Sequence, residues 1–233
     1  MKTIISNRED ALFQAEKAIE RLLEKKPDAV IALSAADDCL PLYELFSNNC
    51  SEGKLSLSHA CFFAVEELEE LPAEDEHSAV FRLRTVLDRT DAAKENCFFL
   101  TAETLGTYDD EISKRGGLDL AVLGIGANAR IGFNEPATPF GSLSHRQKLT
   151  PSTRRELSER FGGEDKMPAY GLTMGIKTLV QAREIMLLAA GDRKAKAVFD
   201  MLYGRDDSTV PAAFLQIPSE VTLYLDESAA AKL

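Results

Sequence analysis

The sequence predicts an α/β fold: a three-layer, doubly wound and mostly parallel sheet with helices on both faces. Two observations predict it. Short runs of continuously apolar residues alternate along the chain with segments whose apolar residues recur at helical spacing. The continuous runs are typical of strands buried on both faces. The segments between them are long enough for the crossovers that parallel strands need.

The first two elements set this pattern. An amphipathic helix is expected after Ser6 and Asn7, both good N-caps, with an apolar stripe over 11–23 before Pro27 ends it. The apolar run 29–33 then predicts a strand that is buried on both faces.

The alternation continues to the end of the chain. Further helices are expected at 41–49, 77–87 and 107–115, and further strands at 57–65, 97–100, 118–123, 185–190 and 221–225. Gly116 and Gly117 end the helix at 107–115. No internal repeat, low-complexity tract or linker rich in Pro or Ser divides the sequence, so one domain over residues 1–233 is expected.

Composition narrows the functional classes. With 233 residues, 45% hydrophobic and 28% charged, the chain has ordinary globular usage, which excludes disordered and fibrous proteins. No window approaches the ~20 apolar residues of a membrane span. The N-terminus lacks the apolar core of a signal peptide, so a cytoplasmic location is expected. The net charge of −11 argues against nucleic acid or a membrane as partner, but not against a small anionic substrate.

The cysteines predict neither a disulfide framework nor a metal site. They form no C-x-x-C pair, and no histidine lies at zinc-ligand spacing from them. Reduced and mostly buried thiols are expected at Cys39, Cys50, Cys61 and Cys97.

The segment after the strand at 118–123 carries the strongest functional signal. Gly124 and Gly126 end the strand, but no third glycine follows at the dinucleotide spacing, and the chain has no G-K-[ST] motif. A long loop over 127–149 follows, with little periodicity of its own. Ligands of open α/β sheets bind beyond the carboxyl ends of the strands, so this loop is a candidate site. Taken alone, Glu135 in this loop is equally a carboxylate that holds a turn.

These residues resemble the glucosamine-6-phosphate deaminase and galactosamine-6-phosphate isomerase family, a relative of the 6-phosphogluconolactonases. The family motif G-[IL]-G-x-[DN]-G-H-[IL]-[AG]-[FL]-N-E-P is matched at Gly124, Gly126, Ile131, Gly132, Phe133, Asn134, Glu135 and Pro136. Segments 115–120 and 210–215 are similar to the galactosamine branch, and the likeness extends over nearly the whole chain. The resemblance implies amino-sugar phosphate chemistry in carbohydrate metabolism, no metal or organic cofactor, and the homo-oligomers common in that family.

The reaction that the resemblance implies opens a pyranose ring, moves a proton between C1 and C2 and expels ammonia. By resemblance, Glu66 stands at the place of the proton-transfer carboxylate, Glu135 survives from the ring-opening relay, and Lys194 matches a phosphate-binding lysine. The remaining positions expected to bind substrate are Ser34, Ala35, Ala36, Gly124, Gly126 and Asn134.

The chain departs from the family pattern where ring opening is expected. Arg130 stands in place of the family's histidine, and a guanidinium stays protonated and has no acceptor, so it cannot shuttle a proton. Asn128 replaces the carboxylate that orients that histidine, and Ala129 replaces the glycine between the two.

The chain also departs from the family at the phosphate loop and at the base. The loop 34–39 contains no glycine, and Asp37 and Asp38 bring negative charge to the expected phosphate site. Glutamate at position 66, instead of aspartate, moves the carboxylate by about one bond length.

Two functions therefore stay open. In the first, the protein is an enzyme of this class, with Glu66 as base, Glu135 positioning groups, and Lys194 with Arg130 holding an anion. A variant of this enzyme acts on an open-chain or non-phosphorylated sugar. In the second, the protein is a non-catalytic relative that binds a ligand or another subunit.

Three residue-level alternatives are also open. Glu66 belongs either to a catalytic centre or to a solvated acidic turn. Asp37 or Asp38 is equally the N-cap of the helix that begins near Pro41. His145 is either a substitute for the missing histidine or an exposed loop residue.

Overall fold

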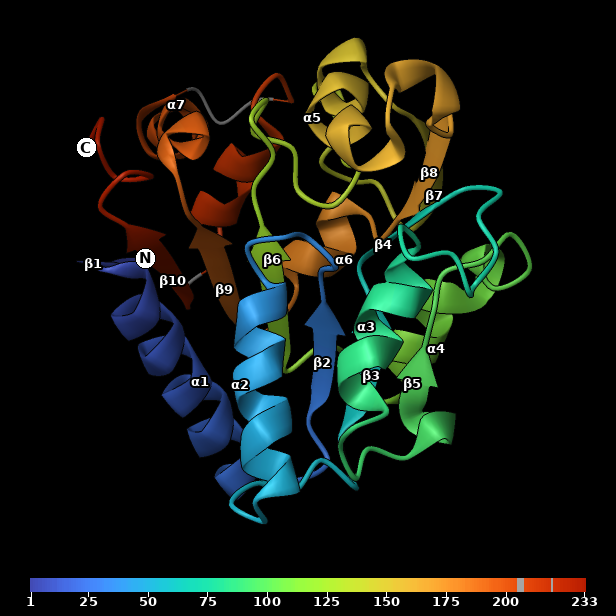
Figure 1. Ribbon diagram of the computed structural model, residues 1–233, viewed down its shortest axis with the longest axis vertical. Coiled ribbons are helices and arrows are strands. Elements are labelled where there is room, and N and C mark those ends of the chain that lie inside the picture. Colours follow the sequence, from blue (N-terminus) through green and yellow to red (C-terminus); the bar gives the residue numbers. More distant parts are fainter. Residues whose placement is uncertain (205–207, 219) are drawn as a thin grey trace.

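The computed structural model describes residues 1–204, 208–218 and 220–233. Within them, the main sheet has seven strands, and every neighbouring pair in it is parallel (Figure 1). In spatial order the strands are β1 (Lys2–Ser6), β10 (Val221–Asp226), β9 (Glu184–Ala189), β6 (Leu120–Gly124), β2 (Val30–Leu33), β3 (Cys61–Ala64) and β5 (Cys97–Phe98). The predicted α/β fold with a mostly parallel sheet is confirmed.

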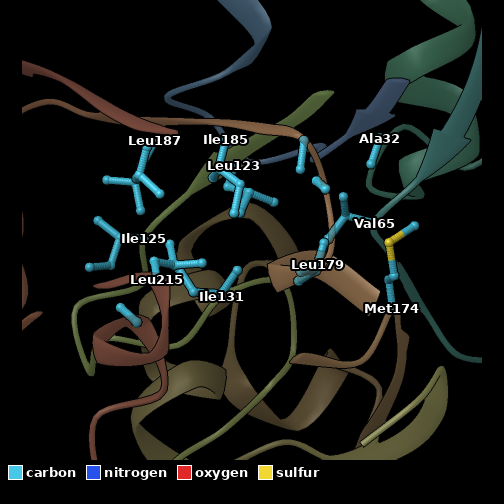
Figure 2. Close-up of a cluster of buried hydrophobic side chains, with 14 of the residues drawn as sticks. Ala32, Val65, Leu123, Ile125, Ile131, Met174, Leu179, Ile185, Leu187 and Leu215 are labelled. Carbon is cyan, nitrogen blue, oxygen red and sulfur yellow. The ribbon is translucent and has the colours of Figure 1, made fainter. Parts of the chain in front are cut away.

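Helices cover both faces of this sheet, as the sequence predicts. One face packs against α1 (Arg8–Lys25), α2 (Leu40–Ser51) and α3 (Ala79–Leu87), and the other against α4 (Tyr108–Lys114), α6 (Ile176–Val180) and α7 (Asp192–Tyr203). Figure 2 shows the hydrophobic core on the second of these faces, where Leu123 and Ile185 of the sheet pack near Leu179 of α6. Short 3-10 helices are found at Lys94–Asn96, Leu105–Thr107, Glu164–Lys166 and Pro211–Gln216.

Local signals place the predicted helices correctly. The Asn7 side chain accepts a hydrogen bond of 2.9 Å from the Asp10 amide and caps α1. Gly116 and Gly117, with φ of 88° and 85°, follow α4 in a conformation that favours glycine.

The predicted strand over 57–65 begins only at Cys61, because the Leu57 amide donates instead to the Asp91 carboxylate at 2.7 Å.

Two expectations, about the capping of α2 and about the cysteines, are wrong. Neither Asp37 nor Asp38 caps α2: the N-cap is Cys39, without a side-chain bond, and Asp37 pairs with arginines instead. The thiols are not mostly buried, because only Cys39 is buried and the other three are partly exposed. All four cysteines are free.

A second sheet stands at the carboxyl end of the main one, and the sequence did not predict it. Its antiparallel strands are, in order, β4 (Glu66–Leu68), β8 (Tyr170–Thr173) and β7 (His145–Lys148). The loop predicted over 127–149 therefore ends in a strand. The four side chains of β7 are all polar, and two are exposed and two partly exposed, so this strand has no apolar pattern in the sequence. His145 lies in this strand, and its Nδ1 contacts the Leu143 carbonyl at 2.8 Å.

The helix α5 (Pro151–Phe161) lies against this second sheet. A small apolar cluster joins the two, made of Leu68, Phe133, Leu149, Leu157 and Met167. Among the described residues, no helix has both the length and the apolar character needed to cross a membrane.

Glu67 connects the second sheet to α3. Its buried carboxylate accepts bonds from the amides of Leu68, Ala79 and Val80 at 2.7 to 3.0 Å and from the Ser78 hydroxyl at 3.0 Å. Two of these amides belong to the first turn of α3, which has no partner within the helix for them. Glu67 therefore fixes where α3 begins.

Glu67→Gln is expected to lower the free energy of unfolding by about 3 kcal/mol. The amide group of glutamine would face one pair of these donors with another donor and leave buried N–H or O–H groups unsatisfied. Urea denaturation measures the effect. Glu74→Gln, at an exposed position in the following loop, is the matched control. Equal stability of the two variants would contradict the capping role.

Candidate active site

The candidate site lies where the strand order of the main sheet reverses. From β2 the chain continues to β3 and β5 on one side, whereas from β6 it continues to β9 and β10 on the other. The loops that follow β2 and β6 therefore leave two adjacent strands in opposite directions and open a crevice at their carboxyl ends. A cleft of about 340 Å³ lies there, lined also by residues of α5 and of the start of α7.

Glu66 lines this cleft, and the structure excludes the alternative of a solvated acidic turn. The side chain belongs to β4, and the residue is 7% exposed. Its Oε1 accepts bonds from the Ser34 hydroxyl at 2.8 Å and the Ala35 amide at 2.7 Å. Its Oε2 is buried and has no hydrogen-bond partner among the described residues. One oxygen is thus held in place while the other is available to a ligand.

The glycine at position 132 leaves room beside the second oxygen of Glu66. Gly132 has a φ of 56°, and a Cβ atom there would lie 3.4 Å from Glu66 Oε2 and closer still to Thr173 and Val65. Burial raises the pKa of Glu66, although the Ser34 hydroxyl and the nearby Arg130 charge act to lower it. A carboxyl group with a raised pKa is a stronger base once it is ionised.

Arg130 also lines the cleft, but it is committed to protein partners. Its Nη1 donates to the Gly132 carbonyl at 2.6 Å, and its Nη2 lies 3.3 Å from the Glu156 carboxylate. Its Nε is buried without a partner among the described residues. Gly126 makes this position possible, because a Cβ there would lie 2.5 Å from the Arg130 Cγ.

Three acidic side chains, Asp37, Asp38 and Glu156, pair with three other cations of the cleft. Asp37 pairs with Arg82 and with Arg160, the latter at 3.5 Å. Burial acts to raise the pKa of Asp37, but the charges of Arg160 and Arg82 outweigh it, so the pKa is lowered. Lys194 lies 2.7 Å from Glu156 and 4.0 Å from Asp38.

Asp38→Asn is expected to raise the free energy of unfolding at pH 8 by about 2–3 kcal/mol and to leave it nearly unchanged at pH 4. Burial raises the pKa of Asp38 from 3.8 to about 6, although the positive charge of Lys194 acts to lower it. A raised pKa means that the protonated carboxyl contributes stability below about pH 4 and that this contribution is lost as the pH rises through 6.

Urea denaturation at pH 4, 6 and 8 checks this prediction. Asp37→Asn is the control on the neighbouring residue and has the opposite sign, because the lowered pKa of Asp37 means that its ionised form stabilises the fold. A gain from Asp38→Asn that is equal at pH 4 and pH 8 would contradict the assignment.

Three predicted residues lie behind the cleft and do not line it. Glu135 is 1% exposed and accepts bonds from the Thr150 amide and hydroxyl, both at 3.1 Å, and from the Asn128 amide at 2.8 Å. Since Thr150 is the N-cap of α5, Glu135 ties the motif loop to that helix. Asn134 donates to the carbonyls of Ile131 and Met174, both at 2.8 Å. Direct contact of these three residues with substrate stays a prediction.

The structure brings the other predicted residues together around the cleft. They are Ser34, Ala35, Ala36, Glu66, Gly124, Gly126, Arg130 and Lys194. Sequence reasoning missed His77, Arg82, Glu156 and Arg160, which line the same cleft. One signal was present for α5: Thr150 before Pro151 is a helix start, and Glu156 and Arg160 stand four residues apart on one helical face.

Comparisons with known proteins show the family to which the chain is similar. A family model described as glucosamine-6-phosphate isomerases/6-phosphogluconolactonase matches residues 8–224. A glucosamine-6-phosphate deaminase of Bacillus velezensis is 36% identical in an alignment of 231 positions that covers 95% of each chain. Another, of Halalkalibacterium halodurans, is 33% identical in an alignment of 232 positions that covers 97% of this chain and 94% of the relative.

Solved structures extend the likeness to three dimensions. A protein described as a monomeric glucosamine-6-phosphate deaminase has a TM-score of 0.96 at 29% identity, over the whole of both chains. A 6-phosphogluconolactonase from Trypanosoma cruzi has a TM-score of 0.81 at 17% identity, over 100% of this chain and 96% of that one, and shares the fold. Within the described part of this chain, no three His, Cys, Asp or Glu side chains are grouped as metal ligands.

Proposed function

This chain belongs to the glucosamine-6-phosphate isomerase/6-phosphogluconolactonase family, and on that premise we propose that it is an amino-sugar phosphate isomerase and deaminase with Glu66 as its base. The observation that carries this proposal is the buried Glu66 carboxylate, with one oxygen held by the loop after β2 and the other unpartnered beside the cleft. Relatives named as glucosamine-6-phosphate deaminases support the substrate class.

The geometry of Glu66 suits a proton transfer between adjacent carbons. In the proposed reaction, Oε2 removes the proton from C2 of the open-chain amino sugar, and a proton moves from the C2 ammonium group to O1, which gives an enolamine. The protonated carboxyl then returns its proton to C1 and leaves an iminium ion at C2, which water converts to the ketose phosphate and ammonium. Because Ser34 and Ala35 hold Oε1, the free oxygen keeps one orientation through both transfers.

Ring opening has no evident catalyst on the motif loop. Arg130 offers only donors, and Asn128 is bonded to Glu135 through its amide nitrogen. We therefore propose that the cleft takes the open-chain form of the sugar, which equilibrates with the ring in solution.

The finer assignment is which epimer of the amino-sugar phosphate, the glucosamine or the galactosamine form, the protein takes as its substrate. Segments 115–120 and 210–215 favour the galactosamine branch, whereas the names of the relatives favour glucosamine-6-phosphate. Ammonia release from each of the two sugar phosphates, with purified and folded protein, tests both assignments at once. Unphosphorylated glucosamine and galactosamine are the matched control substrates.

A second candidate function is favoured by the neutralised cleft. The cations Arg82, Arg130, Arg160 and Lys194 all have carboxylate partners, and Arg130 replaces a group that must shuttle protons. A non-catalytic relative that binds a sugar phosphate has the same features. Binding of glucosamine-6-phosphate without ammonia release from any of the four sugars would reject the enzyme and support this alternative.

A further inference from the structure

The Glu156 carboxylate, on α5, pairs with donors of three chemical kinds, all from other parts of the fold. Its Oε1 lies 2.7 Å from the Lys194 ammonium, and its Oε2 lies 3.3 Å from Arg130 Nη2. Both oxygens are also 3.3 Å from the Ala127 amide. The carboxylate thus bridges α5, the start of α7 and the loop after β6 across the end of the cleft.

This donor set is the one that recognises phosphate groups. An ammonium, a guanidinium and a backbone amide converge on one point at the end of a helix. The helix is α7, of 12 residues, and among the described residues no side chain caps its first turn. The N-terminal end of a helix attracts anions, and Lys194, which holds Glu156 Oε1, belongs to the first turn of this helix.

Glu156 is ionised in this position and only partly shielded from a ligand. Burial acts to raise its pKa, but the charges of Arg130 and Lys194 outweigh burial and lower it. The side chain is 21% exposed and that of Lys194 is 17% exposed, and both line the cleft. An external anion can therefore reach the same donors, but only in exchange for the carboxylate.

We propose that Glu156 is an internal competitor for the phosphate group of the ligand, which binds by displacing this carboxylate from Lys194 and Arg130. This site takes a phosphate monoester. Because the carboxylate must first leave, phosphate binds more weakly here than it would to the same two cations without Glu156. This inference rests on the proposed function for the identity of the sugar, but the exchange itself concerns any phosphate group.

The test measures binding of inorganic phosphate by isothermal titration calorimetry. Glu156→Gln keeps the shape of the side chain and removes its charge, so phosphate is expected to bind about tenfold to a hundredfold more tightly than to the wild type. Glu159→Gln is the matched control. It removes the same charge one position from Arg160 on α5, where Glu159 is 76% exposed and 3.7 Å from Arg193.

Two further measurements locate the effect. Adding Lys194→Met to Glu156→Gln is expected to remove the gain, because the gain depends on the freed ammonium. Binding of unphosphorylated glucosamine is expected to be equal in the wild type and in Glu156→Gln. Wild-type or weaker phosphate affinity in Glu156→Gln overturns the proposal, and so does an equal gain in Glu159→Gln.

Poor folding of Glu156→Gln in phosphate-free buffer would not leave the proposal untested. The readout is then the rise in the thermal unfolding midpoint on adding phosphate, which must be larger than in the wild type. Neither readout depends on turnover. A wild type that releases ammonia while Glu156→Gln gains nothing would reject this inference alone, and a gain in phosphate affinity without any turnover would reject the proposed function alone.

Discussion

Glu66→Gln is expected to reduce ammonia release from the sugar phosphate by about a thousandfold, the range that a lost general base costs. The glutamine side chain can still accept the bonds from Ser34 and Ala35 through its carbonyl oxygen, but its amide nitrogen cannot take a proton from C2. Initial rates of ammonia release at saturating substrate measure the loss.

Stability separates this loss from unfolding. Because burial raises the pKa of Glu66, its ionised form is costly in the folded state, and the neutral variant is expected to be at least as stable at pH 8. Glu69→Gln, directly after β4, removes a carboxylate that pairs with Arg146 outside the cleft and is expected to keep full activity. Retained activity in Glu66→Gln would remove Glu66 from the mechanism.

The same raised pKa gives the wild type a pH profile. Activity requires the ionised carboxylate, so it is expected to fall as the pH decreases through the raised pKa of Glu66.

Arg130→His combined with Asn128→Asp is expected to increase ammonia release by about a hundredfold, the lower end of the range for acid-base catalysis. Histidine can accept and donate a proton near neutral pH, which a guanidinium cannot. Asn128 Oδ1 already lies 3.3 Å from the Arg130 backbone amide, so a carboxylate at this position is close enough to orient the new imidazole, at the loss of the bond that the Asn128 amide donates to Glu135. The rate constant at saturating substrate is the quantity to compare.

The single substitutions are the controls for this gain. Asn128→Asp alone is expected to give no increase, because Arg130 still offers no acceptor. Arg130→His alone is expected to give a smaller increase, since nothing fixes its tautomer. If the folded double variant releases ammonia no faster than the wild type, ring opening does not limit the rate, and the phosphate end of the cleft becomes the limiting feature.

Much of the fold was predictable because buried parallel strands leave a local signal. The runs that became β2, β6, β9 and β10 are apolar at nearly every position, as burial on both faces requires. β7 was not predictable, because His145 to Lys148 are all polar and half exposed. β1 is an edge strand with mostly exposed side chains, so it too lacks a buried pattern.

The candidate site was predictable only in part. The motif after β6 and the carboxylate at Glu66 are local in sequence, and the structure gathers Glu66, Arg130 and Lys194 around one cleft. The pairing of Glu156 with Lys194 joins residues 38 positions apart, on different helices, and no local pattern specifies it. Tertiary ion pairs of this kind decide how much free positive charge the cleft offers, and they become visible only in three dimensions.

The attachment of α5 makes the cleft sensitive to ionic strength. On one side the helix is held by a small apolar cluster around Leu157, and on the other its charged face bridges the cleft through partly exposed ion pairs. The screening length of dissolved salt is roughly 8 Å at 0.15 M, longer than these pairs, and about 3 Å at 1 M, so only concentrated salt weakens them; it does not weaken the apolar contacts of the main sheet. Concentrated salt is therefore expected to weaken the ion pairs that hold α5 at the cleft, while the seven-stranded sheet beneath it keeps its stability. A phosphate ligand then binds to a less rigid site in concentrated salt than in dilute buffer.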